Sequence, residues 1–298
     1  MSLTDEQIRS RRTSARERAH RRHARRRALL LGAAVVLAGV VVTAIALAAR
    51  GGGSGAQRGA GARAQRGAGA RALSGPTSDR RGIPPAQPGR AQVVQQGSTA
   101  SGEVALTFDD GFCAACVARI VDVLWRTGAH ATFFPNGTYS SSWGPQAPRI
   151  RAMLARGQIV VGNHTFTHHD PRTESPDTFA ADLARNESWI EKTFGVSGRP
   201  WFRPPYGAYD GATLGVAGQQ GYTRVVLWSG TLADSSPQTI PYLLKATRDW
   251  GHPGIIILGH ANYPNTGRAL PRILDILRAR HLRLVTVAEL LGAPTGAG

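Results

Sequence analysis

At residues 104–111 the chain reads Val-Ala-Leu-Thr-Phe-Asp-Asp-Gly, an apolar run that ends in two adjacent carboxylates and a glycine. The absence of charge in its first five residues predicts a buried strand. Neighbouring side chains on a strand point to opposite faces, so Asp109 and Asp110 share a site only where the chain turns, and Gly111 allows such a turn. Two carboxylates this close need a cation or hydrogen bonds to stay ionised. We therefore expect a metal ion or an arginine beside the pair, although a surface turn without chemistry also fits this stretch alone.

Beyond this strand, strand-like runs alternate with helical patterns to the end of the chain. We expect strands at residues 104–109, 131–136, 158–163, 201–203, 223–228, 254–259 and 283–287. We expect helices at residues 114–127, 147–156, 176–194, 210–220, 237–250 and 268–280. Ser175-Pro176 and Ser236-Pro237 predict two of the helix starts. Seven strands alternating with helices predict an α/β fold of parallel units, either a barrel or a doubly wound sheet.

The unusual residues of the chain follow the expected strand ends. They are Asp109, Asp110, Asn136, His164, Arg203, Trp228 and His260. In both candidate folds reactive side chains gather at the carboxyl ends of the strands. Random polar placement would rarely produce this regularity, so we expect one site at that edge.

Two histidines, His164 and His168, follow the third expected strand. Residues four apart on one face of a helix lie about 6 Å from each other, close enough to hold one cation. Two imidazoles and a carboxylate such as Asp110 leave positions open for water and substrate, as in catalytic metal sites. Taken alone, this spacing is more often found in solvated or core histidines. We expect the next residue, His169, beside the site or in solvent.

Two further strand ends carry Arg203 and His260. The prolines at 204 and 205 fix the backbone after Arg203, whose guanidinium suits a carboxylate, and Asp109 is its natural partner. An arginine that ties down a loop is an equally good interpretation of this motif alone. His260 ends an otherwise apolar strand, and a histidine there can act as an acid near neutral pH.

Together, four motifs in this order resemble the polysaccharide deacetylases, the NodB homology domain of carbohydrate esterase family 4. They are TFDDG at 107–111, HTFTH at 164–168, RPPY at 203–206 and LGH at 258–260. The resemblance spans about residues 103–290. It implies a distorted (β/α) barrel, here with seven strands, and removal of N-acetyl or O-acetyl groups from sugar polymers. It also implies a divalent metal, most often Zn2+, with Co2+, Ni2+ or Mn2+ as alternatives.

By position, the resemblance assigns Asp110, His164 and His168 to the metal. It makes Asp109 the base that removes a proton from the attacking water, oriented by Arg203. These assignments agree with the chemistry of the reaction, because a metal lowers the pKa of bound water towards about 7 and polarises the acetyl carbonyl.

The resemblance also assigns His260 as the acid that protonates the leaving amine. The residues implied to contact substrate or oxyanion are Tyr206 (through its backbone N–H), Leu258 in the acetyl pocket, and Trp228. One motif departs from the family: where it usually reads Asp-x-x-Asp-Trp, this chain has Thr-Leu-Ala-Asp-Ser at 231–235. Asp234 survives as the expected partner of His260.

The chain has two cysteines, Cys113 and Cys116, immediately after the Asp-Asp-Gly turn. Their i, i+3 spacing in an extracellular domain favours a local disulfide, with two packed thiols as the alternative. A second metal site lacks further ligands.

The N-terminal third of the sequence predicts a transmembrane segment followed by a flexible linker. An arginine-rich tail at 1–27 precedes 22 uncharged residues at 28–49, which as a helix span roughly 33 Å. The arginines place the tail in the cytoplasm and the rest of the chain outside. A signal peptide cleaved near Ala46-Leu47-Ala48 is the alternative. Residues 50–100 contain the octapeptide AQRGAGAR twice in succession and read as a flexible linker before a domain at 101–298.

The basic character of the chain belongs to its tail. Residues 1–50 carry 11 arginines against 3 acids and residues 51–99 carry 7 against 1, whereas residues 100–298 have a net charge of only +3. This distribution speaks against nucleic acid as a partner. We predict a single-pass, metal-dependent hydrolase that removes N-acetyl groups from an envelope polysaccharide, either peptidoglycan or a chitin-like polymer. The alternatives are an O-acetyl sugar esterase and a carbohydrate-binding wall protein of weakened activity.

Overall fold

The structure, a computed structural model, describes residues 89–292. Its strands are β1 (Gln92–Val94), β2 (Glu103–Asp110), β3 (Ala131–Pro135), β4 (Ile159–Val161), β5 (Trp201–Phe202), β6 (Arg224–Val226), β7 (Gly230–Thr231), β8 (Ile256–His260) and β9 (Arg283–Val285). The α-helices are α2 (Ala114–Thr127), α3 (Ser140–Trp143), α4 (Ala147–Ala155), α5 (Pro176–Phe194), α6 (Gly211–Gln219), α7 (Ile240–Trp250), α8 (Pro264–Ala279) and α9 (Val287–Leu290). Two 3-10 turns matter below, η2 (Gly137–Tyr139) and η5 (Pro205–Gly207).

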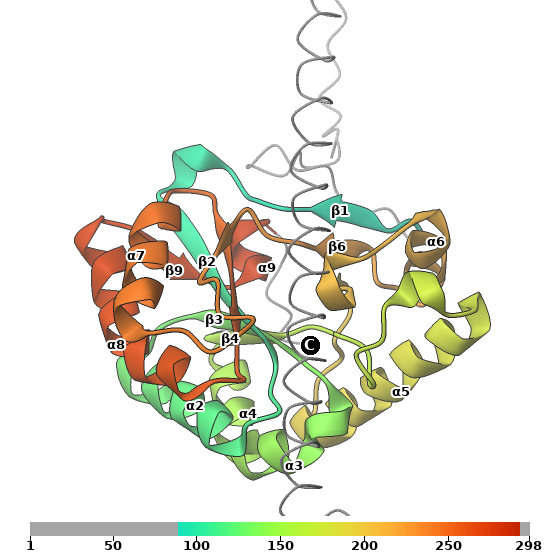
Figure 1. Ribbon diagram of the computed structural model, residues 1–298. Coiled ribbons are helices and arrows are strands. Elements are labelled where there is room, and N and C mark those ends of the chain that lie inside the picture. The colour runs from blue at the N-terminus through green and yellow to red at the C-terminus, as the bar shows by residue number, and fades with distance from the viewer. Residues whose placement is uncertain (1–88, 293–298) are drawn as a thin grey trace, which may run out of the picture. The chain divides into compact units, whose positions relative to one another are not determined.

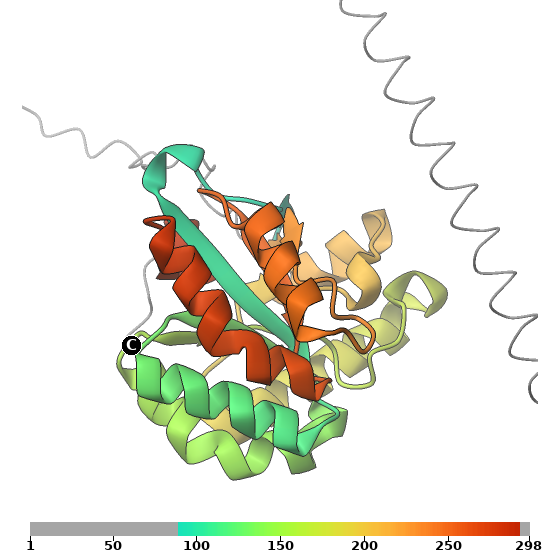
Figure 2. The ribbon, with the colours of Figure 1, turned by 60° about the vertical axis from the view of Figure 1, so that its left-hand side comes forward.

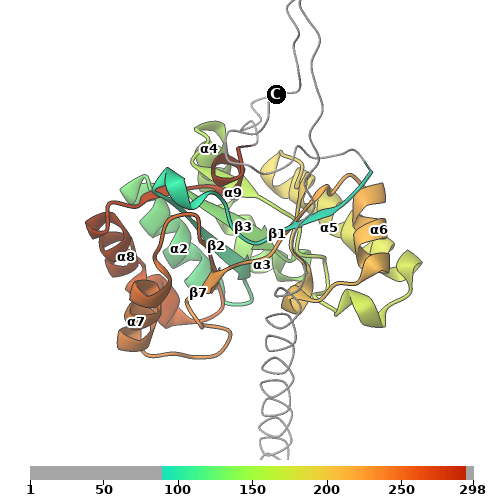
Figure 3. The same ribbon diagram turned by 90° about the horizontal axis from the view of Figure 1, so that it is seen from above.

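The strands make an α/β barrel-like fold from two sheets (Figure 1). The larger sheet has the order β4-β3-β2-β8-β7, and the smaller has β1-β6-β5, with parallel pairing throughout. β9 pairs with the first half of β2, on the edge that β3 occupies along its second half. A parallel bridge between Asn163 and Phe202 joins the end of β4 to β5. Seen from above, α2, α7 and α8 lie on one side of the strands and α5 and α6 on the other (Figure 3).

The central strand β2 is buried along its whole length, and its two faces have different surroundings. Val104, Leu106 and Phe108 pack in the main core, together with apolar residues of α2 and α8. Figure 2 shows these two helices running alongside the strand. Ala105 belongs to a second core cluster with Val226 of β6 and residues of β8 and β9. The alternation of a strand therefore turns Thr107 and Asp109 away from α2 and α8, towards the inside of the barrel.

Most of the expected elements are present, and the barrel-like α/β fold is confirmed. The helices expected at 114–127 and 176–194 have these bounds, and Ser175 caps the second by accepting a hydrogen bond from Thr178 N. The start expected at Ser236-Pro237 is wrong, because Thr239 caps α7 instead and leaves the preceding residues in a loop.

The short strands β1 and β7 are additions to the sequence-based prediction. β1 pairs with β6 in parallel and lies inside the segment 50–100 that the sequence presents as linker. The folded unit therefore begins before residue 101. Two residues of β7 and three of β1 are too few for a hydrophobic period to show in the sequence.

In the described range, 89–292, none of the helices is long and apolar enough to cross a membrane. The predicted tail at 1–27, the predicted span at 28–49 and the linker up to residue 88 lie outside the described residues.

Candidate active site

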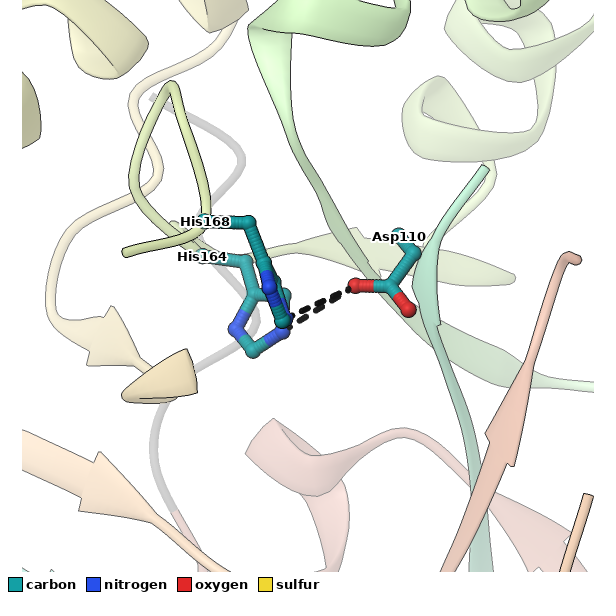
Figure 4. Close-up of side chains that lie close together, drawn as sticks. All are labelled: Asp110, His164 and His168. Carbon is teal, nitrogen blue, oxygen red and sulfur yellow. Dashed lines mark ion pairs between the residues drawn. The ribbon is translucent and has the colours of Figure 1, made fainter. Parts of the chain in front are cut away.

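Asp110, His164 and His168 converge at the carboxyl ends of β2 and β4 (Figure 4). Asp110 Oδ1 lies 3.4 Å from His164 Nε2 and 3.2 Å from His168 Nε2. The side chain of His164 is almost fully buried and that of His168 is one-fifth exposed. The histidines do not share a helical face, as the spacing suggested: the segment after β4 is a loop. Their rings nevertheless meet, with centroids 5.0 Å apart.

The site is built from backbone in an unusual conformation. Within residues 89–292, six residues other than glycine have positive φ, and five of them surround this site: Asp110, Thr165, His168, Tyr206 and Ala233. Such conformations cost free energy and persist where the surrounding structure holds them. Gly111, with φ 114°, completes the turn, since a Cβ there would lie 2.1 Å from Trp143 Nε1. The indole instead donates a hydrogen bond to the Asp110 carbonyl oxygen.

The donor set fits a divalent cation. Asp110 Oδ1 is buried and has no hydrogen-bond partner within the described residues, so it presents an unsatisfied anionic oxygen to the two imidazoles. His164 Nδ1 lies 2.6 Å from the Arg203 carbonyl oxygen, to which it donates, so Nε2 is the ring nitrogen that faces Asp110. Burial and the charge of His164 lower the pKa of His168 to about 4, which keeps its imidazole neutral. Burial opposes ionisation of Asp110, but His164 and His168 together hold the pKa of this carboxyl below its usual range.

Asn262, in the loop between β8 and α8, orients the Asp110 carboxylate. Its Nδ2 donates to Asp110 Oδ2 at 2.7 Å, which leaves Oδ1 to face the histidines. Its Oδ1 accepts from the backbone N–H groups of Gly111 at 3.0 Å and Phe112 at 3.3 Å. Asn262 was not identified from the sequence. The one feature that could have indicated it is its position two residues after His260, at the end of a strand.

Two residues hold the histidine loop in place: Asn136, which the sequence places at a strand end without a role, and Asp182, which the sequence does not single out. Asn136, at the end of β3, donates through Nδ2 to the carbonyl oxygens of His164 at 2.6 Å and Thr165 at 3.0 Å. The Asp182 carboxylate on α5 accepts from the N–H groups of Phe166 and Thr167 and from the Thr167 hydroxyl. These contacts from other elements explain why the segment is a fixed loop rather than a helix.

Asp109 and Arg203 form a buried ion pair inside the barrel. Arg203 Nη1 lies 2.7 Å from Asp109 Oδ1 and also donates to the Thr107 hydroxyl, while Nε and Nη2 donate to the carbonyl oxygens of Val226 and Leu227. Arg203 is completely buried. Burial lowers the pKa of Arg203, and the charge of Asp109 partly offsets this effect. The other carboxylate oxygen, Asp109 Oδ2, lies 3.7 Å from His164 Nε2 and so borders the metal-ligand cluster.

His260 and Asp234 form a second pair, on β8 and in the loop after β7. The Asp234 carboxylate contacts His260 Nδ1 at 2.8 Å and accepts from the His260 backbone N–H and from the Thr266 hydroxyl. Burial alone would lower the pKa of His260, but the hydrogen bond and charge of Asp234 outweigh it and raise the pKa to about 9. His260 is therefore protonated at neutral pH, with Nε2 available as a proton donor. Thr266, on α8, gave no signal in the sequence.

The residues expected to contact substrate surround these pairs. Tyr206, in η5, is 70% exposed, and its ring centroid lies 4.7 Å from that of His168. Trp228 is half-buried and packs against Gly207, where a Cβ would come within 2.8 Å of the indole. Leu258 is buried on β8, two residues before His260. His169 is exposed and pairs with Glu174 away from the ligand set.

Cys113 and Cys116 are joined by a disulfide at the start of α2. Cys113 is the N-cap of the helix, and its sulfur accepts a hydrogen bond from the Cys116 backbone N–H. The bridge thus anchors the chain three residues after Asp110.

Comparisons with known proteins agree on one family. The family model described as polysaccharide deacetylase matches residues 96–225. The chain is 30% identical over 206 residues to a peptidoglycan-N-acetylglucosamine deacetylase of Bacillus cereus, covering 63% of this chain and 87% of that protein. It is 31% identical over 201 residues to a chitooligosaccharide deacetylase of Bradyrhizobium, covering 63% and 90%.

A solved structure supports the same assignment. The chitin deacetylase of the fungus Colletotrichum lindemuthianum superposes with a TM-score of 0.61 at 27% identity, covering 68% of this chain and 93% of the other. The chain therefore belongs to the polysaccharide deacetylase family, carbohydrate esterase family 4.

Proposed function

We propose that this protein is a metal-dependent hydrolase that removes N-acetyl groups from an N-acetylglucosamine polymer of the cell envelope. The observation that carries the proposal is the convergence of Asp110, His164 and His168, with Asp110 Oδ1 buried and unpartnered, beside the separate Asp109–Arg203 pair. This arrangement offers three ligands for a divalent metal and a carboxylate that is not needed as a ligand. A deacetylase needs both parts.

The chain's own residues supply the proton transfers. A divalent metal held by Asp110, His164 and His168, with Zn2+ the favoured ion, would lower the pKa of a water molecule towards about 7 and polarise the acetyl carbonyl. Asp109 accepts the proton of the attacking water through Oδ2, because Arg203 engages its Oδ1 and fixes the carboxylate plane.

The remaining residues act on the tetrahedral centre. His260 enters the reaction protonated and donates from Nε2 to the departing amine, while Asp234 holds Nδ1 and stabilises the positive charge. The backbone N–H of Tyr206 is the proposed donor to the oxyanion. Leu258 and Trp228 line the space for the acetyl group and the sugar.

The substrate class follows from the relatives and from the N-terminus. Among the relatives are deacetylases of peptidoglycan, chitin and chitooligosaccharides. We propose that residues 28–49 anchor the chain in the membrane, with the arginine-rich tail inside and the catalytic unit outside. An anchored domain on a linker reaches a wall polymer within the length of that linker.

An acetate-release assay tests the proposal. Purified full-length chain is incubated with peptidoglycan, β-1,4-linked N-acetylglucosamine oligomers and acetylated xylan, with added Zn2+ and after chelation. We expect acetate from the first two, loss of activity with chelator and recovery with metal. Release from acetylated xylan alone would identify an O-acetyl esterase. Saccharide binding without acetate release from any substrate would identify a carbohydrate-binding wall protein instead.

A further inference from the structure

Three aromatic side chains meet next to Asp110 and have no part in the chemistry described above. Phe112 follows Asp110 by two residues, Tyr139 ends η2 after β3, and Tyr263 precedes α8. The ring centroid of Phe112 lies 6.1 Å from that of Tyr139 and 5.5 Å from that of Tyr263, both in edge-on contact. Phe112 is 48% exposed, and the two tyrosines are half-buried. These three residues are the aromatic platform below.

The platform is rigidly connected to the metal ligand. The Phe112 backbone N–H donates to Asn262, the residue whose amide also holds Asp110, and Tyr263 is the next residue after Asn262. On the other side of Phe112, Cys113 is fixed by its disulfide to Cys116. One asparagine and one disulfide therefore fix the position of the platform relative to Asp110, so little ordering is needed when a ligand binds.

The platform is also uncharged. Burial, followed by the negative charge of Asp110, raises the pKa of Tyr139, so its phenol is neutral. A single exposed aromatic residue needs no explanation, but three rings contributed by three different loops beside a reactive centre indicate a binding surface.

We propose that the aromatic platform is a sugar subsite, which holds a neutral pyranose ring of the glycan next to the residue that is deacetylated. The inference rests on the proposed function. A pyranose presents a face of C–H groups and a rim of hydroxyls. The Phe112 ring matches the C–H face, and the tyrosines combine ring edges with hydroxyl groups that donate or accept hydrogen bonds at the rim.

Binding and kinetics of Phe112→Ala, measured in the full-length chain, test this subsite. The probes are β-1,4-linked N-acetylglucosamine oligomers of two to six units. Calorimetric titration measures their affinity, and acetate release measures the kinetics. In the wild type, affinity and kcat/KM should rise with oligomer length as the subsite fills. In Phe112→Ala we expect the longer oligomers to bind roughly tenfold more weakly, which corresponds to the loss of one stacking contact, with the effect in KM rather than kcat. Phe112→Trp should restore the dependence on length.

Trp125→Ala is the matched control, because Trp125 is 37% exposed in the last turn of α2, the helix that begins after Phe112, and lies against Arg156. It should retain the wild-type length dependence. Equal binding of long oligomers by Phe112→Ala and wild type overturns the inference, and so does an equal loss at every length, which would indicate distortion of the Asp110 turn. If wild type binds oligomers with this length dependence but releases no acetate, the proposed function fails while the subsite stands.

Discussion

Replacing Asn262 by alanine isolates the residue that orients the Asp110 carboxylate. The change removes the 2.7 Å hydrogen bond from Asn262 Nδ2 to Asp110 Oδ2, and with it the acceptor for the N–H groups of Gly111 and Phe112. Within the described residues Asp110 Oδ2 then loses its hydrogen-bond donor, and the carboxylate is free to rotate away from His164 and His168. We predict weaker metal binding.

The size of the effect follows from the kind of bond that is lost. A hydrogen bond to a charged acceptor contributes about 1.5–3 kcal/mol when its partner is buried. At about 1.4 kcal/mol per factor of ten, the dissociation constant for Zn2+ should rise roughly ten- to a hundred-fold. Residues that orient metal ligands in other proteins have effects of this size.

Competition with a chromogenic chelator measures the dissociation constant, and circular dichroism confirms that the variant is folded. Asn265→Ala serves as the control, since Asn265 in the same region donates to the Gln238 carbonyl oxygen and does not contact the site. Should folded Asn262→Ala bind Zn2+ within threefold of wild type, the claim that Asn262 positions Asp110 is wrong. If alanine prevents folding, Asn262→Ser retains an acceptor for the backbone and gives the same test.

Four further predictions concern the two ion pairs. Asp109→Asn should lower kcat by about 10²–10⁴-fold with metal affinity retained, and a loss below tenfold in acetate release would exclude Asp109 as the base. Arg203→Met leaves the buried Asp109 carboxylate unpaired, so the free energy of unfolding measured in urea should fall by about 3–5 kcal/mol. A decrease of less than about 1 kcal/mol would contradict this account. Because the pKa of His260 is raised from 6.5 to about 9, activity should fall above that pH, and Asp234→Asn should move this limb to lower pH in a pH–rate profile. The same pair stabilises the fold fully below pH ~6.5 and loses its contribution as the pH rises through about 9, which urea unfolding at several pH values can follow.

The sequence was sufficient for those features that depend on local pattern. Three such features depend only on residues close together in the sequence, and each appears in the structure. They are the apolar run before Asp109, the cap at Ser175 and the alternation of strands with helices. The rule that parallel strands gather their carboxyl ends at one edge then predicted that distant residues would meet. This rule requires only the direction of the strands, and it contains no information about how the chain turns at each strand end.

The turns themselves depend on contacts that no local pattern contains. His164 and His168 have helical spacing, yet Asp182 and Asn136 hold the segment between them as a loop. Asn262 reaches Asp110 across 152 positions of sequence. An asparagine in a loop is ordinarily a turn residue, so the residue type at position 262 did not indicate a role in the site.

The two adjacent aspartates show why the site needs both the strand and its abrupt end. Asp109 still follows the alternation of β2, so it points into the barrel, where Arg203 neutralises it. Asp110 has left that alternation, with φ 69°, and its carboxylate turns instead to Asn262 and the histidines. Each carboxylate therefore has a hydrogen-bond donor of its own, Arg203 for Asp109 and Asn262 for Asp110, which offsets the repulsion between the two neighbours. Because the partners are separate, loss of the base and loss of the metal ligand should be separable by mutation: a change at Asp109 should spare metal binding, whereas a change at Asp110 should abolish it.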